Sequence, residues 1–159
     1  MNKNKIFIAC PISKYLNENG MDKKFESFIK DIYNTCCNYS NNVFMALYRE
    51  KFGQARMEDD ECTPLDFMEM KDADYVIAIP EDSMGVAVEL GWASAMEKNI
   101  FLVINKKFKT SPLVNALDTV AKVEKFMVST EHGYDDVQEE IIESIEQYLK
   151  SKENIVNFV

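Results

Sequence analysis

The chain has 159 residues, 47% of them hydrophobic, and its 27 acidic residues outnumber 18 lysines and arginines to give a net charge of −9. This length and composition predict one globular domain over residues 1–159, and the negative charge argues against a nucleic-acid partner, whose phosphates must be neutralised by Lys and Arg. A single histidine, His132, excludes a multi-histidine metal centre. No metal site is expected, and the carboxylates are the first candidates for chemistry.

The cysteines and the apolar segments predict a cytoplasmic protein. Cys10, Cys36, Cys37 and Cys62 show no Cys-x-x-Cys spacing, which is typical of reduced thiols. The amino-terminal residues lack the apolar core of a signal peptide, and no run of about 18 apolar residues could cross a bilayer. We therefore expect no membrane partner.

The amino-terminal part of the chain predicts a strand, a loop and a helix. Ile6–Ala9 is a short apolar run typical of a buried strand, and a polar loop follows over residues 11–21. Asp22 is placed to cap a helix, because its carboxylate can accept from a free backbone N–H of the first turn. The predicted buried face of this helix consists of Phe25, Phe28, Ile29, Ile32 and Cys36.

The next part predicts two more strands with a helix between them. Val43–Leu47 is the expected second strand and Tyr75–Ile79 the third. Thr63 and Pro64 have the pattern of an N-cap followed by proline at the first helical position. A short helix carrying Asp66 is therefore expected to begin there.

The rest of the chain continues the alternation. Apolar residues at helical spacing, or an N-cap followed by proline, predict helices at 85–97, 111–117 and 135–152. Apolar runs at Ile100–Ile104 and Val123–Val128 predict the fourth and fifth strands.

Strands separated by helices imply right-handed crossovers, so the predicted fold class is α/β. We expect a five-stranded, parallel, doubly wound sheet of the Rossmann or flavodoxin-like kind, with helices on both faces. Ligands of such sheets bind at the carboxyl ends of the strands, near the point where the strand order reverses. The loops at 10–21, 48–62, 80–84 and 105–111 are therefore expected to line the site.

Familiar classes with this architecture do not fit these loops. The loop after the first strand is Cys10-Pro11-Ile12-Ser13, which lacks the glycines that a dinucleotide-binding turn requires. No Gly-Lys-Ser/Thr of a phosphate-binding P-loop occurs in the chain. A receiver domain would need an acidic pair after the first strand and a phosphate-accepting aspartate at the end of the third, and the chain has neither.

The turn and helix after the third strand carry the candidate chemistry. Asp82 and Ser83 lie where this strand ends, and Gly85 permits close approach of a ligand at the start of the helix. Glu89 stands a turn further, beside the inward-facing Leu90, where partial removal from water lets a carboxylate act as nucleophile or base. The helix dipole also favours a glutamate there, so position alone does not establish catalysis.

Four stretches together resemble the nucleoside 2-deoxyribosyltransferase family, whose relatives include 2′-deoxynucleoside 5′-phosphate N-hydrolases and cytidylate N-glycosidases. They are Ile6-Phe-Ile-Ala-Cys-Pro-Ile12, Asp66, Ala73-Asp74 before a strand, and Ser83-x-Gly-x-x-x-Glu-Leu-Gly-x-Ala93. The similarity extends over roughly residues 5–117. Position by position, it implies that Glu89 is the family's glutamate nucleophile and that Asp66 handles a proton at the departing base.

The resemblance also implies a set of substrate-binding residues, namely Phe7, Cys10, Pro11, Ile12, Asp82, Ser83, Gly85, Ser111 and Asn115. Six residues before the glutamate, 5′-monophosphate hydrolases carry a serine that donates to phosphate, and this chain has Ser83. A phosphate would need positive compensation in so acidic a chain, and Lys14, Arg49 and Arg56 are candidates that solvated surface positions would explain equally well.

The chain departs from the family pattern at two positions in and after the first strand. Phe7 and Cys10 stand where the family has tyrosine and glycine, and Tyr15 is a candidate to replace the lost hydroxyl. Family members complete each pocket with a residue from a neighbouring subunit. Asn115, or Ser111 in second place, would have that role here, which implies a homo-oligomer, a dimer or larger, with shared active sites.

The implied reaction is cleavage of the N-glycosidic bond of a nucleoside or its 5′-monophosphate through a covalent intermediate on Glu89, without a cofactor. Transfer to another nucleobase and hydrolysis by water are both open. A non-catalytic nucleotide-binding sensor is an alternative of another class, which Phe7 and Cys10 motivate. A glycohydrolase of a larger dinucleotide is a third, if the loop at 48–62 leaves room.

Overall fold

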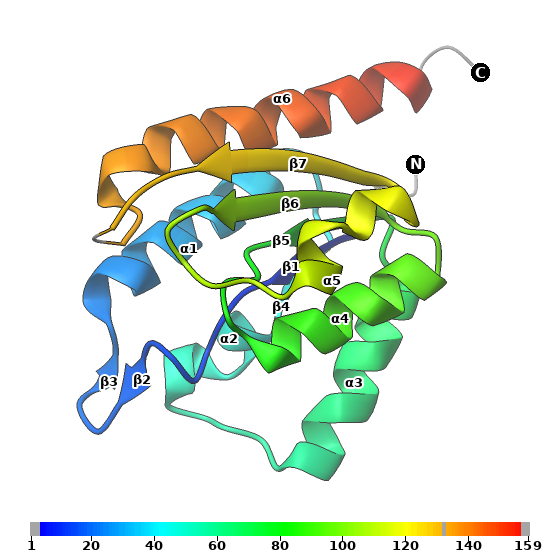
Figure 1. The fold of residues 1–159 in the computed structure, drawn as a ribbon. Helices are drawn as coiled ribbons and strands as arrows, with labels where there is room; N and C mark the ends of the chain where they lie inside the picture. Colours follow the sequence, from blue (N-terminus) through cyan, green and yellow to red (C-terminus); the bar gives the residue numbers. More distant parts are fainter. Residues whose placement is uncertain (1–3, 132, 157–159) are drawn as a thin grey trace.

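The computed structural model describes residues 4–131 and 133–156, and its centre is a parallel sheet. The strands are β1 (Ile6–Ala9), β4 (Val43–Met45), β5 (Tyr75–Ala78), β6 (Asn99–Asn105) and β7 (Val123–Val128). They lie in the order β4-β1-β5-β6-β7, and every neighbouring pair is parallel. The predicted five-stranded, doubly wound α/β fold is confirmed (Figure 1).

Helices cover both faces of the sheet (Figure 1). The long helices α1 (Lys23–Cys37) and α6 (Gln138–Val156) pack on one face, and α3 (Asp59–Asp72) and α4 (Met84–Ala95) on the other. Within the described residues, no helix is long and apolar enough to cross a membrane.

The remaining elements are short. They are the two-stranded hairpin β2 (Leu16–Asn17) and β3 (Gly20–Met21), helices α2 (Ala46–Arg49) and α5 (Pro112–Asn115), and 3-10 turns at Lys51–Gly53, Leu117–Thr119 and Asp135–Val137. The hairpin lies within the loop after β1 that the sequence predicts to be irregular.

The core consists of two hydrophobic layers that the sheet separates. Along β1, Ile6 and Ile8 point into the layer with α1 and α6, and Phe7 and Ala9 into the layer with α3 and α4. This alternation follows from the two-residue period of a strand, and both faces are apolar because helices cover both. The helix face predicted for residues 25–36 is buried as expected.

Two predicted element boundaries are wrong. Helix α3 begins at Asp59, and Pro64 lies inside it rather than at its first position. Asp59, Asp60 and Glu61 fill the first turn, where the helix dipole favours acids. The second predicted strand ends at Met45, because the chain turns into α2 instead of continuing extended to Leu47.

The chain order reverses between β1 and β5. From β1 the chain crosses to β4 on one side and then returns through α3 to β5 on the other. Backbone pairing persists beyond β5, since the Ile79 amide donates to the Ala9 carbonyl at 2.9 Å. The carboxyl ends of β1 and β5, with the turn that starts α4, therefore form the crevice where ligands of such sheets bind.

Candidate active site

Helix α4 places Glu89 over this crevice. Ser83 caps the helix by accepting from the Val86 amide at 3.3 Å, and Leu90 anchors it in the core with 1% of its surface exposed. Burial, together with the nearby Asp66 carboxylate, raises the pKa of Glu89 from 4.5 to about 8, against the opposing influence of Arg49. Much of the Glu89 population is therefore protonated at neutral pH.

Asp66 approaches from α3 and is paired with Arg49 of α2. The Arg49 Nη1 and Asp66 Oδ1 atoms are 2.6 Å apart. Burial raises the pKa of Asp66, although Arg49 opposes this effect. The two carboxyl groups that the resemblance singles out thus lie near each other in the structure, since the Asp66 carboxylate contributes to the raised pKa of Glu89.

Arg49 is not the solvated surface charge that the sequence favours. Its side chain is only 22% exposed, pairs also with the buried Glu50 at 3.3 Å, and lies 5.4 Å from the centre of the Phe44 ring. The early turn from β4 into α2 produces this position, since an extended strand through Leu47 would carry Arg49 elsewhere. Arg49 is therefore part of the carboxylate cluster.

The turn before α4 presents polar groups at the helix amino terminus. Asp82 is exposed, Ser83 is partly exposed, and Gly85 is exposed with no backbone close above it. Because the Ser83 oxygen accepts from Val86, its hydroxyl hydrogen is available to donate to a ligand. Backbone amides and the helix dipole favour an anion at the same place.

The first-strand candidates are mostly buried. Phe7 is fully buried against Phe44, so its ring has no surface to offer a ligand. Cys10 and Pro11 are buried and Ile12 is partly exposed. Burial raises the pKa of the Cys10 thiol, and the carboxylates of Glu89 and Glu81 add to that rise, which indicates that Cys10 lies near both.

Glu81 lies next to the site and is not among the residues that the sequence motifs single out. Its side chain is 1% exposed and accepts from the hydroxyls of Tyr15 at 2.7 Å and Tyr134 at 2.6 Å, and from Lys14 Nζ at 2.6 Å. Its φ of 42° is in the left-handed region, which residues other than glycine rarely adopt. The carboxylate thus joins the loops after β1, β5 and β7.

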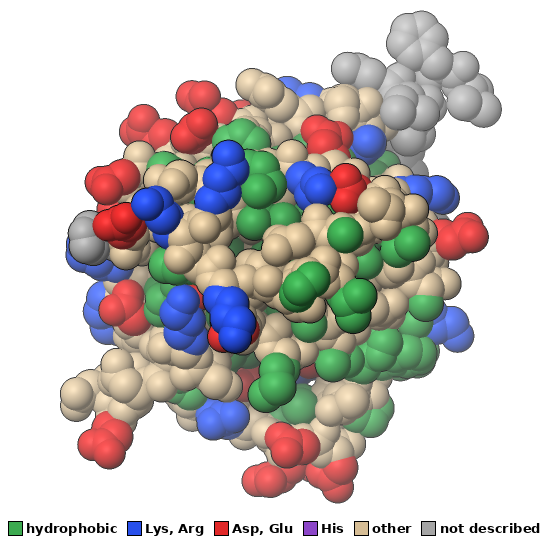
Figure 2. All heavy atoms as spheres, in the orientation of Figure 1, with side chains coloured by type: hydrophobic (Ala, Val, Ile, Leu, Met, Phe, Trp, Pro, Cys, Tyr) green, Lys and Arg blue, Asp and Glu red, His purple; other side chains and the backbone are tan. Residues whose placement is uncertain are grey.

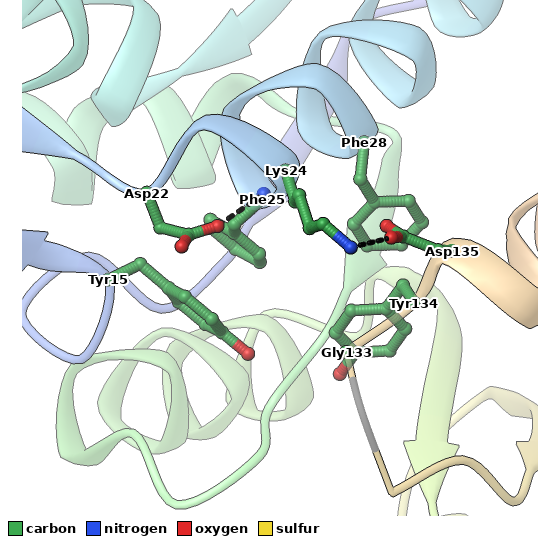
Figure 3. A pocket seen from close by; sticks show the side chains of 8 residues that line it. All are labelled: Tyr15, Asp22, Lys24, Phe25, Phe28, Gly133, Tyr134 and Asp135. Atoms are coloured by element: carbon green, nitrogen blue, oxygen red, sulfur yellow. Dashed lines mark hydrogen bonds and ion pairs between the residues drawn. The ribbon is translucent and has the colours of Figure 1, made fainter.

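These bonds correct the expectation for Tyr15. Its ring stacks on Phe25 with centroids 3.7 Å apart, and its hydroxyl is bound to Glu81 rather than standing in for the family's tyrosine beside Glu89. Figure 3 shows Tyr15 and Tyr134 on opposite sides of a pocket of about 230 Å³. Its other lining residues are Asp22, Lys24, Phe25, Phe28, Gly133 and Asp135.

This pocket lies on the face of the sheet that α1 covers, whereas Glu89 and Asp66 belong to helices on the opposite face. Lys24 and Asp135 form an ion pair of 2.6 Å across it (Figure 3). Its walls therefore support the loops through Glu81 instead of lining the carboxylate pair.

Asn115 and Ser111 lie on α5, beyond β6. Ser111 caps the helix by accepting from the Leu113 amide at 3.3 Å, as its position before proline predicts. The Asn115 side chain is exposed and donates to the Thr110 carbonyl at 3.4 Å. Among the described residues of the chain, neither side chain is hydrogen-bonded to Glu89 or Asp66, and the suggested roles of Ser111 and Asn115 stay predictions.

The part of the chain that the structure describes contains no group of three or more His, Cys, Asp or Glu side chains placed to hold a metal ion. His132 lies outside the described residues. The functional groups of the site are the desolvated carboxyl groups of Glu89 and Asp66, the Arg49 guanidinium and the amino terminus of α4.

Together, the fold and the site define a flavodoxin-like α/β protein with a desolvated acid–base pair at the carboxyl edge of its sheet. Solved structures of this kind include a CMP N-glycosidase, BcmB, from Clostridium botulinum, at 26% identity and a TM-score of 0.68 over 91% of this chain and 99% of that one. The solution structure of BlsM matches at 28% identity and a TM-score of 0.71 over 96% and 95% of the two chains. These two neighbours confirm the resemblance to the nucleoside 2-deoxyribosyltransferase family and its N-glycosidase relatives that the sequence predicts.

A conserved protein from Enterococcus faecalis V583 shares the fold at 15% identity and a TM-score of 0.54, covering 91% of this chain and 98% of that chain. No protein-family model and no curated protein sequence matches the chain.

The raised pKa of Glu89 predicts a pH-dependent effect on stability. Between pH 4.5 and about pH 8, Glu89 is ionised in the unfolded chain but stays largely protonated in the folded protein. The free energy of unfolding therefore falls as the pH rises through this range. Glu89→Gln removes that cost and should raise the melting temperature by at least about 3 °C at pH 8, with a smaller gain at pH 5. Thermal unfolding at the two pH values measures it.

Asp82→Asn is the control, because Asp82 is an exposed acid on the adjacent turn. It should show no such pH-dependent gain. A gain for Glu89→Gln that is the same at both pH values would contradict the assignment of a desolvated, partly protonated carboxyl.

Proposed function

We propose that the protein is an N-glycosidase that hydrolyses the bond between base and sugar in a nucleoside 5′-monophosphate, with Glu89 as nucleophile. One observation carries the proposal, namely the desolvated Glu89 carboxyl beside the Arg49–Asp66 pair. A CMP N-glycosidase with 26% identity over nearly the whole of both chains supports the same reaction class.

In the first step, Glu89 gives up its proton and an oxygen of its carboxylate attacks the anomeric carbon. The carbon–nitrogen bond breaks and its electron pair leaves with the base. Asp66 takes the proton from Glu89 and donates it to the departing base, so one proton serves both events. The product is a glycosyl ester on Glu89, as in retaining glycosidases.

In the second step, water attacks the anomeric carbon and the ester bond to Glu89 breaks. Asp66, now ionised, takes a proton from the water, and the free sugar phosphate leaves. Arg49 keeps Asp66 in place throughout and moderates the rise of its pKa, so that the carboxyl can both give and accept a proton.

The 5′-phosphate would bind at the start of α4. Ser83 has a hydroxyl hydrogen to donate there, and Gly85 leaves the helix amino terminus open. Charge-assisted bonds from such a hydroxyl and from backbone amides are stronger than neutral ones. This arrangement supports a monophosphate in preference to a free nucleoside.

A second copy of the chain is proposed to complete the site. Large apolar side chains are exposed on the helices around it, with Met84 86% and Leu113 84% exposed and Val88 of α4 52% exposed. Figure 2 shows hydrophobic side chains gathered over α4 and α5 on this face. A homodimer that buries them would bring Asn115 of one copy toward the pocket of the other.

Glu89→Ala should abolish base release from cytidine 5′-monophosphate, by at least about 1,000-fold, because no other group can form the ester. Chromatography of the released base over hours measures it. Glu143→Gln, at an exposed acid of α6 on the opposite face of the sheet, is the control and should retain the activity within a few-fold.

Adding a second free base to the wild-type reaction separates the alternatives. Hydrolysis yields free sugar phosphate alone, whereas exchange of the base would mean transfer. Binding of the monophosphate by calorimetry without any base release from the wild type would overturn the enzyme assignment in favour of a nucleotide sensor.

Ser83→Ala should lower kcat/KM for the monophosphate about 10- to 100-fold and leave that for cytidine nearly unchanged, since the lost bond goes to a charged phosphate. Ser83→Thr keeps the hydroxyl and the cap and should retain the preference. Steady-state kinetics with both substrates make the comparison. An equal loss with cytidine and with its monophosphate would rule out the phosphate role.

Leu113→Glu should convert a dimer into a monomer and reduce base release, because a buried charge opposes the apolar contact. Analytical ultracentrifugation measures the mass of the assembly. Mixing the inactive Glu89→Ala protein with Asn115→Ala tests whether sites are shared, because a mixed dimer would contain one site with both residues intact and should recover base release. Val120→Glu, at a position 77% exposed next to the start of β7, is the matched control. A wild-type monomer with full activity would contradict the shared site.

A further inference from the structure

The loop after β6 carries a local excess of positive charge in this acidic chain. Lys106, Lys107 and Lys109 lie within four residues of one another and all three side chains are exposed. Lys107 pairs with Glu131 at 2.8 Å. Among the residues that the structure describes, no carboxylate is within ion-pair distance of Lys106 or Lys109. The positive charges of Lys106 and Lys109 are thus not neutralised by a nearby carboxylate of the described residues.

The fold holds this loop in a defined position. The Lys106 amide donates to the Val128 carbonyl at 2.9 Å, which extends the pairing of β6 with β7. The buried Asn105 side chain donates to the Thr130 carbonyl at 2.9 Å and accepts from the Lys107 amide at 3.1 Å. The lysines therefore project from an anchored turn.

Phe108 and Lys14 also link the loop to the turn that precedes α4. Phe108 lies under the Lys14 ammonium, which is 4.0 Å from the ring centre, and Lys14 bonds to Glu81. Glu81 is two residues before Ser83, the proposed phosphate contact. Figure 2 shows Lys and Arg side chains on this face, in the region where the loop from β6 to α5 runs in Figure 1.

Two of the three cations that the sequence suggests for phosphate compensation already have carboxylate partners. Arg49 is paired with Asp66 and Lys14 with Glu81. The exposed Asp82 adds a negative charge next to Ser83. A doubly charged phosphate approaching a protein of net charge −9 would therefore be repelled unless cations on a neighbouring element attract it.

We propose that Lys106 and Lys109 form an electropositive rim that attracts phosphorylated substrates to the site and so favours a nucleoside 5′-monophosphate over a free nucleoside. The inference rests on the proposed function. Exposed charges act over about 10 Å at 0.1 M salt, so the rim speeds encounter without touching the reacting atoms. Its signature is a salt-dependent kcat/KM with an unchanged kcat.

The test uses the double variant Lys106→Glu/Lys109→Glu and kinetics with cytidine 5′-monophosphate and cytidine at 20 and 300 mM salt. At low salt, kcat/KM for the monophosphate should fall about 5- to 20-fold in the variant, with kcat unchanged. The decrease of the monophosphate kcat/KM with salt that is expected for the wild type should be absent from the variant. The kcat/KM for cytidine should be the same in both proteins.

The matched control is Lys71→Glu/Lys122→Glu, which changes the net charge equally at exposed lysines near the amino ends of the strands. It should reduce the monophosphate kcat/KM less than twofold. The proposal would be contradicted by an equal loss of the monophosphate kcat/KM in this control. A loss confined to kcat, or an equal loss of kcat/KM with cytidine, would contradict it as well.

Failure of the proposed function has a different outcome. If the wild type releases no base from any substrate, calorimetry with cytidine 5′-monophosphate at the two salt concentrations tests the rim alone. Binding that weakens with salt in the wild type and not in the double variant supports the rim. Equal binding by both proteins, or none by either, overturns it.

Discussion

The removal of the Glu89 carboxyl from water is the constraint around which this site is organised. The apolar layer that seats Leu90, Val86 and Phe7 makes α4 pack closely on the sheet, and Glu89 is carried to the edge of that layer. A carboxyl there is costly to ionise, and the same cost makes it reactive once it is ionised against a bound sugar. Its environment therefore connects the packing of the core to the proposed chemistry.

The charged groups around Glu89 come from separate elements and have distinct effects. Asp66 raises the pKa of Glu89, and Arg49 lowers it while holding Asp66 at 2.6 Å. The pKa values of both carboxyl groups are raised by burial, and Arg49 opposes the rise at each of them. Two carboxyl groups with raised pKa values suit the proposed reaction, which needs a nucleophile and a proton for the leaving base.

On the other face of the sheet, the carboxylate of Glu81 has a structural role, because it holds together loops through hydrogen bonds to Lys14, Tyr15 and Tyr134. It is almost fully buried, and two hydroxyls and an ammonium donate hydrogen bonds to it. Two glutamates eight residues apart thus differ in what surrounds them. Glu81 holds the turn that presents Ser83, and Glu89 is the proposed nucleophile.

The sequence by itself determined the order and type of the five sheet strands and of the long helices between them, although not the β2–β3 hairpin or helix α2. Apolar runs of strand length, the Asp22 cap and the helical spacing of residues 25–36 depend on local physics, and the structure reproduces them. The spacing from Ser83 to Glu89 lies within one helix, so its geometry was also readable. Boundaries near Pro64 and Leu47 were not, because first-turn acids and an early turn into α2 outweighed the local signal.

Only the tertiary structure decided which charges meet. Arg49, Asp66 and Glu89 lie on three different helices, and nothing in their sequence spacing distinguishes Arg49 from a solvated residue. The bonds of Glu81 join Tyr15 and Tyr134, which lie far apart in the sequence. Desolvation and contact between distant residues exist only in the folded chain, and they set the protonation on which the proposed reaction depends.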